Sequence, residues 1–393
     1  MDRRRLALWL TMAWGAGSRR IEAVLTGVRD PERFERAVRQ NRREEFAAQL
    51  APEAAHRLRR VEEDAVTAML RALDDRGFEM LERGDGRYPE RLAQIPGAPP
   101  LLFVEGNLDG LDEEMALAVV GTRRISEAGG ELTRALALDL AGRGVTLVSG
   151  MALGADGIAH RAALERGART IAVLACGLDR TYPAEHEALR RAIAAAGAVV
   201  SEQPLGIPPL PAYFLRRNRI LTGLAMGVLV TEAPARSGAL NSARHAAEQG
   251  RDVFVALPPD GVPRENNEGG IQLMEDGAIG VRRAEEILAA YRGSYRLTLE
   301  PRSAGGMRTE RSRPAPAAPR PDPPAPAGPP TRPEGVSETA LRLWELMDGR
   351  IWQADALAAA AGIPAAGLMA ALTELELTGF ITSHPGRRYS RAR

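Results

Sequence analysis

Glycines, hydroxyl groups and arginines gather in four segments of the chain, each of which follows an apolar run. The segments begin at Gly121, Ser149, Tyr213 and Glu232. Glycine lets backbone amides approach an anion, and arginine offers a planar fork to phosphate oxygens. The four segments together predict a rim that binds a phosphorylated ligand.

The segment from Tyr213 onward adds aromatic rings to the cations. Tyr213 and Phe214 are followed by Arg216, Arg217 and Arg219. Aromatic faces beside cations are typical of sites for single-stranded nucleic acid, where bases stack on the rings and arginines neutralise phosphates. The alternative interpretation, which stays open at this point, is that Phe214 belongs to the core and the arginines are solvated.

Acidic and histidine side chains near these segments admit a structural interpretation and a catalytic one. Asp156 and His160 are four residues apart, so they share a helix face. We favour a helix cap for Asp156 and a packed, hydrogen-bonded His160 over a catalytic or metal-binding pair. Glu202 and Glu232 each end an apolar run, and we expect them to orient arginines rather than to act as hydrolase acids.

Composition excludes several kinds of chemistry. The chain of 393 residues contains no lysine, which rules out a Schiff-base lysine and a Walker-type phosphate lysine. Its single cysteine, Cys176, excludes an internal disulfide and a cysteine-based zinc site. No histidine pair has a usual metal-ligand spacing, and we expect neither a metal nor a cofactor. The net charge of +1 means that any polyanion site depends on a local concentration of arginine.

Between residues 115 and 291 the sequence alternates apolar runs with helical stretches, which predicts a parallel sheet covered on both faces. We therefore predict a Rossmann-like, doubly wound α/β core at 85–295. Ligands of such sheets bind beyond the carboxyl ends of the strands, where the four segments lie. The predicted strands are Leu101–Val104, Ala116–Val120, Val145–Ser149, Thr170–Ala175, Ala198–Ser201, Gly227–Thr231 and Asp252–Leu257. The predicted helices between them are Gly129–Ala141, Ile158–Arg166, Ala184–Ala196 and Leu240–Gln249.

The flanking regions differ from the core in composition. Residues 1–80 predict a helical domain, with a last helical stretch at 52–75. Residues 301–335 are rich in proline and predict a linker, and residues 336–393 predict a winged helix of three helices and a two-stranded hairpin. The run from Met1 to Ser18 imitates a secretion signal, but we favour a first helix, no membrane segment and a cytoplasmic protein.

Six motifs in order resemble the core of the DNA-processing protein A family (DprA/Smf). They stand at Val120–Ser126, Ser149–His160, Gly177–Pro183, Ser201–Glu202, Phe214–Arg219 and Glu232–Ala243. The resemblance implies a homodimeric, non-enzymatic protein that binds single-stranded DNA and helps to load the RecA recombinase in natural transformation. The DNA-binding residues it implies are Gly121, Arg123, Ser126, Ser149, Gly150, Phe214, Arg217, Asn218, Arg219, Ser237 and Gly238.

An enzymatic alternative is a nucleotide phosphoribohydrolase of the lysine-decarboxylase-like Rossmann group. That group carries a phosphate-binding loop with a catalytic glutamate, whereas the comparable loop here, Ser237–Ser242, has no carboxylate. Two departures from the DprA pattern are Leu215 in place of proline and Ala155 in place of isoleucine.

The flanking domains give weaker signals for DNA contact. The turn from Trp14 to Arg20 resembles a helix-hairpin-helix, although a plain helix connection explains it nearly as well. The candidate recognition helix of the winged domain, Ala365–Thr378, has acids and no arginine, so we do not expect sequence-specific reading of a duplex. The arginines that follow it suggest backbone phosphate or a protein as the partner of the tail.

Overall fold

The protein consists of two compact units, Met1–Ala304 and Gly305–Arg393. The structure is a computed structural model. It describes residues 1–258, 266–291, 336–347, 352–363, 365–378, 380–384 and 388–391. The predicted linker at 301–335 lies outside these residues. No helix of the described ranges is both long enough and apolar enough to cross a membrane.

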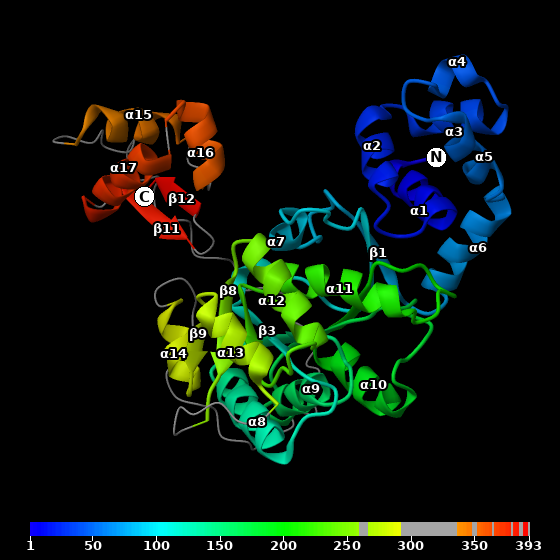
Figure 1. Cartoon of the computed structure of the whole chain (residues 1–393). Coiled ribbons are helices and arrows are strands. Elements are labelled where there is room, and N and C mark those ends of the chain that lie inside the picture. Colours follow the sequence, from blue (N-terminus) through cyan, green and yellow to red (C-terminus); the bar gives the residue numbers. More distant parts are fainter. Residues whose placement is uncertain are drawn as a thin grey trace, which may run out of the picture. The chain divides into compact units, whose positions relative to one another are not determined.

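A nine-stranded sheet forms the centre of the first unit, in the order β1-β2-β6-β5-β4-β3-β7-β8-β9. Figure 1 shows this sheet among the helices of the first unit. Strands β3 to β9 are parallel to one another, while β1 and β2 are antiparallel additions at one edge. The strands are β1 Glu79–Glu82, β2 Leu101–Gly106, β3 Ala116–Val120, β4 Thr146–Ser149, β5 Thr170–Val173, β6 Ala198–Ser201, β7 Gly227–Val230, β8 Asp252–Ala256 and β9 Ile279–Val281. The predicted strands are therefore confirmed, and the sequence analysis missed β1 and β9.

Helices cover both faces of this sheet, as the sequence predicted. Successive residues of a strand point to opposite faces, so Ala118 packs with α11 and α12 while Leu117 and Val119 pack with α8, α9 and α14. The helices of the core are α7 Glu90–Ala93, α8 Glu127–Gly142, α9 Ala155–Glu165, α10 Glu187–Ala196, α11 Pro211–Gly223, α12 Gly238–Glu248, α13 Glu268–Glu275 and α14 Ala284–Ala289.

Helix α11 was not among the predicted helices, since from the sequence alone we expected a long loop that reaches Arg219. Pro211 occupies the first turn of the helix, where its missing N–H costs nothing and its fixed φ favours the helix. Ile220 and Leu221 are buried against the sheet. The aromatic and cationic residues of this segment therefore project from a rigid helix.

The N-terminal helices pack against the β1–β2 edge and share a hydrophobic cluster with the core. Trp9 and Leu58 from these helices are fully buried in the same cluster as Phe103 of β2. The helical stretch expected at 52–75 divides into two helices, because Glu62 is extended and begins a new one. These helices are α1 Arg3–Trp14, α2 Arg19–Gly27, α3 Pro31–Arg39, α4 Arg43–Phe46, α5 Pro52–Arg59 and α6 Glu63–Asp74.

The second unit has the helix and strand order of a winged helix. Ser337 caps its first helix by accepting a hydrogen bond from the amide of Ala340 at 3.2 Å, as the sequence predicted. Its strands form a small sheet in the order β10-β12-β11, of which β10 was not expected. The elements are α15 Glu338–Leu346, β10 Trp352–Gln353, α16 Ala354–Ala361, α17 Ala365–Leu377, β11 Ile381–His384 and β12 Arg388–Arg391. The expected Pro385–Gly386 tip of the wing lies outside the described residues.

Candidate nucleic-acid interface

A cavity of about 620 Å³ lies at the carboxyl ends of the parallel strands. Strands β3 and β7 are neighbours in the sheet, and the strands that follow them, β4 and β8, lie on opposite sides of this pair. A parallel α/β sheet characteristically binds its ligand at such a switch point. The loops after β3 and β7 and one face of α11 form the walls of the cavity.

Most of the residues that the sequence singled out meet at this cavity. Those that line it are Gly121, Arg123, Phe214, Arg217, Asn218, Ser237 and Gly238. Ser126, Ser149, Gly150 and Arg219 do not line it. The structure thus brings segments far apart in the chain to one place, but it leaves some of the expected contacts outside the cavity.

Three exposed arginines, Arg123, Arg124 and Arg236, line the cavity. None of the three guanidinium groups forms an ion pair within the described part of the chain. Because arginine keeps its proton at any ordinary pH, this wall offers three positive charges to an anion. We call these three residues the cationic rim.

Phe214 holds one arginine of the cationic rim in place. The guanidinium carbon of Arg123 lies 4.7 Å from the centroid of the Phe214 ring, a geometry in which the ring attracts a cation. Tyr182 packs against the same ring edge-on, with centroids 5.3 Å apart and an interplanar angle of 64°. Phe214 is half-buried, so it acts in this structure mainly as a support for its two neighbours.

Arg217 also approaches Phe214, with its guanidinium carbon 6.0 Å from the ring centroid, but it belongs to the floor of the cavity. Only 5% of the residue is exposed, and its guanidinium donates to the carbonyl oxygens of Gly150, at 2.8 Å, and Val173. A Cβ atom on residue 150 would lie 2.4 Å from the nearest nitrogen of that guanidinium. Gly150 therefore makes room for Arg217, whereas the sequence suggested that it makes room for an anion.

Asp156 lies near Arg217 at the base of the cavity. Burial raises the pKa of the Asp156 carboxyl, and the positive charge of Arg217 partly opposes this shift. Burial likewise lowers the pKa of Arg217, which the charge of Asp156 partly opposes. The pair shares a buried environment in which each group favours the charged form of the other.

The expected helix cap by Asp156 is wrong, because the residue lies inside the first turn of α9 and the cap position is Gly154. The Asp156 carboxylate instead accepts from the amide of Ala152 at 3.3 Å. It thereby ties the loop after β4 to the helix that follows it.

His160 is fully buried and hydrogen-bonded, as predicted. Its Nδ1 lies 2.8 Å from the Thr170 hydroxyl, which itself donates to the carbonyl oxygen of Leu147. Thr170 therefore accepts from Nδ1–H, and the Nε2 atom has no partner among the described residues. Burial lowers the pKa of His160 to about 3, which fits a neutral core residue. Cys176 is buried too, as expected of a small hydrophobic residue.

Glu202 and Glu232 have different roles. The Glu202 carboxylate pairs with Arg219 at 2.6 Å, which confirms its expected role in orienting an arginine. Arg219 also donates to the carbonyl oxygen of Gly97, so its guanidinium is held away from the cavity. The same expectation is wrong for Glu232, which accepts from the backbone amide and hydroxyl of Ser126.

The serines of the predicted site are mostly engaged in local structure. Ser126 caps α8 by accepting from Gly129 at 3.0 Å, and Ser149 is fully buried and donates to the carbonyl oxygen of Val119. Ser237 caps α12 by accepting from Ala239 at 3.2 Å. Of these caps, only Ser237 lines the large cavity, so the N-terminal end of α12 adds positive potential there.

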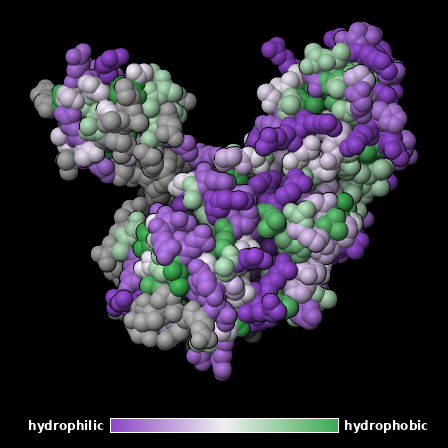
Figure 2. Space-filling view, viewed as in Figure 1, coloured by the Kyte–Doolittle hydropathy of each residue, from purple (hydrophilic) through white to green (hydrophobic). Residues whose placement is uncertain are grey.

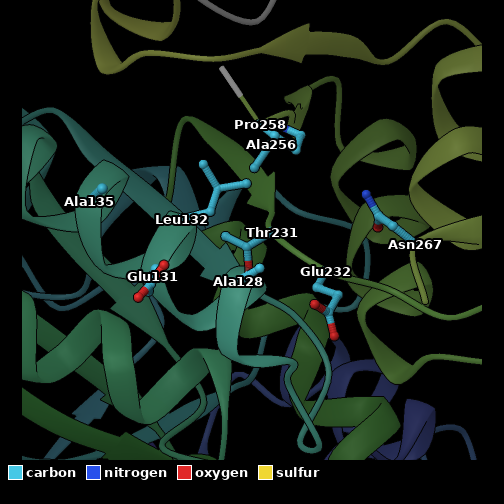
Figure 3. Close-up of a pocket in the computed structure, with 10 residues that line it drawn as sticks. Ala128, Glu131, Leu132, Ala135, Thr231, Glu232, Ala256, Pro258 and Asn267 are labelled. Carbon is cyan, nitrogen blue, oxygen red and sulfur yellow. The ribbon is translucent and has the colours of Figure 1, made fainter. Parts of the chain in front are cut away.

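A second cavity, of about 310 Å³, lies beside α8 and the ends of β7 and β8 (Figure 3). Among the residues that the structure describes, the charged ones that line it are Glu131 and Glu232. Thr231 and Asn267 add neutral polar groups. Two carboxylates disfavour a phosphate ligand by like-charge repulsion, so charge distinguishes this cavity from the one beside the cationic rim.

Three residues that line the cavity beside the cationic rim, which we call the cationic cavity, were not predicted from the sequence. Arg124 lies in the motif Val120–Ser126, Arg236 in the motif Glu232–Ala243 and Tyr182 in the motif Gly177–Pro183. Their signal was present, since each is an arginine or aromatic residue just beyond a predicted strand. Nothing in the sequence distinguished these exposed side chains from Arg217, which is buried.

Comparison with known proteins agrees with this geometry. A doubly wound parallel sheet with its cavity at the switch point defines the Rossmann-like class of α/β proteins. Residues 79–292 match the family model of DNA recombination-mediator protein A, and residues 313–387 match the DprA winged helix domain. The chain belongs to the DNA recombination-mediator protein A family, which confirms the resemblance and the winged helix.

Individual relatives support the assignment. Protein Smf of Escherichia coli is 40% identical over 304 residues, which span 76% of this chain and 74% of that protein. The X-ray structure of DNA processing protein A from Streptococcus pneumoniae covers 74% of this chain and 98% of that one, with a TM-score of 0.62 and 31% identity. A structure of the Helicobacter pylori protein, described for its unique single-stranded DNA binding mode, covers 56% and 97%, with a TM-score of 0.50 and 31% identity.

Proposed function

We propose that this protein binds single-stranded DNA in the cationic cavity and delivers it for recombination. The observation that carries the proposal is the cationic rim, where three exposed guanidinium groups without ion-pair partners in the described chain face one cavity. The N-terminal end of α12 reinforces their potential. Family membership and the DNA-binding relative from Helicobacter pylori support the same conclusion.

The proposal assigns different roles to the residues implied by the resemblance. Arg123, Asn218 and Gly238 would contact the strand, because they line the cavity. Arg217 and Gly150 would shape its floor, and Arg219 would brace α11. For Ser126 and Ser149 the hydrogen bonds to protein atoms support a structural role.

Fluorescence anisotropy with a labelled single strand and a matched duplex tests the proposal directly. If three arginines neutralise three phosphates, log K should fall against log salt with a slope of about −2, at roughly 0.7 per phosphate for single strands. Arg191→Ala is a matched control, because Arg191 is an exposed arginine on α10 away from the cavity. Equal loss of binding in Arg123→Ala and Arg191→Ala would contradict the assignment of the site.

We also propose a homodimer that passes its strand to RecA in the cytoplasm, as the family resemblance implies. Light scattering after size-exclusion chromatography tests the dimer. A strand-exchange assay in which RecA must displace single-strand-binding protein tests the loading role. A monomer, or an unchanged lag before strand exchange, would refute the corresponding part of the proposal.

We infer that the protein acts without catalysis. Asp156 is the one carboxylate among the described residues that line the cavity, and its hydrogen bond with Ala152 and its electrostatic interaction with Arg217 support a structural role. Incubation with nucleoside monophosphates tests the phosphoribohydrolase alternative. Release of free base would overturn our inference.

A further inference from the structure

The ring that the sequence assigned to base stacking is already engaged. Phe214 has Arg123 over its ring and Tyr182 against it, and the residue is half-buried. A nucleobase needs an aromatic or apolar surface that faces the solvent. Another side chain of the cavity must therefore supply that surface if bases are held there.

Tyr182 is the exposed ring of this cluster. It lines the cavity from the loop after β5, and 41% of the residue is exposed. The edge-on contact with Phe214 fixes its ring beside Arg123. Tyrosine offers a large rigid surface at a low cost in conformational entropy, so this ring is prepared to stack.

One other exposed apolar side chain lines the same cavity, and two more are next to its lining residues in the chain. Leu215 lines it and is 51% exposed. Leu153 and Leu210 are exposed as well, and each adjoins a residue of the cavity wall, Ala152 and Pro211 respectively. Figure 2 shows hydrophilic side chains over most of the visible surface, with apolar residues in small patches between them. Apolar exposure gathered at one cavity indicates a binding surface.

We propose that Tyr182 and Leu215 form a platform for unpaired nucleobases, whose phosphates the cationic rim neutralises. This inference rests on the proposed function, and it adds that the protein contacts the bases of the strand as well as its phosphates. Charge and polarity together indicate a nucleotide as the ligand. A nucleotide carries a flat base and an anionic phosphate, and the cavity has an apolar platform beside three cations. A duplex stacks its bases internally, so the platform would favour single strands.

The test compares three DNA probes of equal length in fluorescence anisotropy. One is a labelled oligo-dT, the second replaces its central nucleotides with abasic tetrahydrofuran residues that keep every phosphate, and the third is the duplex of oligo-dT with oligo-dA. The wild-type protein should bind oligo-dT at least fivefold more tightly than the abasic strand. Tyr182→Ala should lose this preference through weaker binding of oligo-dT, with unchanged binding of the abasic strand.

Matched variants separate stacking from other effects. Tyr182→Phe keeps the ring and should bind like the wild type, while Leu215→Ser should lose part of the preference. Arg123→Ala should weaken the binding of both single strands by the same factor, because it removes a phosphate contact.

The outcomes distinguish the two proposals. Absence of wild-type binding to both single strands would refute the proposed function itself. Equal wild-type affinity for oligo-dT and the abasic strand would overturn the platform and leave DNA binding intact. Equal weakening of both strands by Tyr182→Ala would also overturn it, since the ring would then act only through the position of Arg123.

Discussion

Arg123 at the cavity and Arg391 in the C-terminal unit both place a guanidinium group over an aromatic ring, yet only one remains available to a ligand. The Arg391 carbon lies 3.9 Å from the Trp344 ring centroid, and its N–H groups donate to the carbonyl oxygens of Trp344 and Glu345. These oxygens belong to the last turn of α15, where helix carbonyls lack intrahelical partners; the Trp344 oxygen also accepts from the Met347 amide at 3.2 Å. Arg391 is thereby a helix cap, whereas Arg123 is exposed and forms no ion pair among the described residues.

Arg217 adds an intermediate case, because it lies beside the same ring as Arg123 but is buried. Its guanidinium donates hydrogen bonds to backbone carbonyl oxygens, as that of Arg391 does. An arginine beside a ring is therefore available to a ligand only if its N–H groups do not already donate to backbone carbonyl oxygens. Four substitutions test this distinction.

Arg217→Ala should have the largest effect, and on stability. It removes the donor to two carbonyl oxygens and the positive charge that most strongly favours the Asp156 carboxylate, which together should lower the free energy of unfolding by about 3 kcal/mol or more. Urea denaturation of the full chain, with Arg191→Ala as control, measures the change. If Arg217→Ala weakened DNA binding without a loss of stability, Arg217 would belong with Arg123 as a ligand contact.

Arg123→Ala should lower the free energy of unfolding by no more than about 1 kcal/mol, the value of an exposed cation–π contact. It should weaken single-strand binding by roughly tenfold, since a solvated charge is lost from the cationic rim. The salt slope should become shallower by about 0.7. Anisotropy titrations across salt concentrations, combined with a thermal melt of the same sample, measure both quantities. An unchanged slope would show that Arg123 does not neutralise a phosphate.

Arg391→Ala should destabilise the C-terminal unit by about 1 kcal/mol through loss of the cap and should not change DNA binding at the cavity. Hydrogen exchange in the full chain should show about fivefold weaker protection of the α15 amides, with the core amides unaffected. Weaker binding of single strands with normal protection would place Arg391 among the DNA contacts instead.

Asp156→Asn should leave the cationic rim intact and change only the pH dependence of stability. Because the pKa of Asp156 is raised in the folded state, the folded protein holds this proton more tightly than the unfolded chain. The wild-type free energy of unfolding therefore includes a term that falls as pH rises from about 3.9 through the raised value. Its slope is at most about 1.4 kcal/mol per pH unit.

Urea denaturation of the wild type and Asp156→Asn between pH 4 and 7 isolates this term as the difference between the two curves. The asparagine keeps an acceptor for the Ala152 amide but has no titrating proton. Parallel curves would show that the buried environment around Arg217 does not raise the pKa of Asp156.

Much of the core architecture was predictable because its signals are local. Continuous apolar runs identified the parallel strands from Ala116 to Asp252, and motifs beyond their ends identified the loops of the cavity. The short edge strands β1 and β9 carry weak patterns, and pairing with neighbours in the sheet decides them. Helix α11 was missed because its polar face resembles a loop, although its buried face packs on the sheet.

The candidate site was predictable as a set of segments but not as a set of roles. Spacing indicated which loops meet at the switch point, because the order of elements fixes which strand ends come together. It did not indicate that Gly150 makes room for a side chain, or that Tyr182 is the exposed ring while Phe214 supports it.

The sequence by itself determined the class of fold, the position of the cavity and the family. It also determined which permanently charged cation the cavity can use, since a chain without lysine has only arginine for this role. The tertiary structure decided which of those arginines face solvent. Arg123 and Arg217 are the same residue type in neighbouring motifs, and only the packing of α11 against the strand ends buries one and exposes the other. Burial and the competition of carbonyl oxygens for a guanidinium depend on atoms far away in the chain, and no local pattern encodes them.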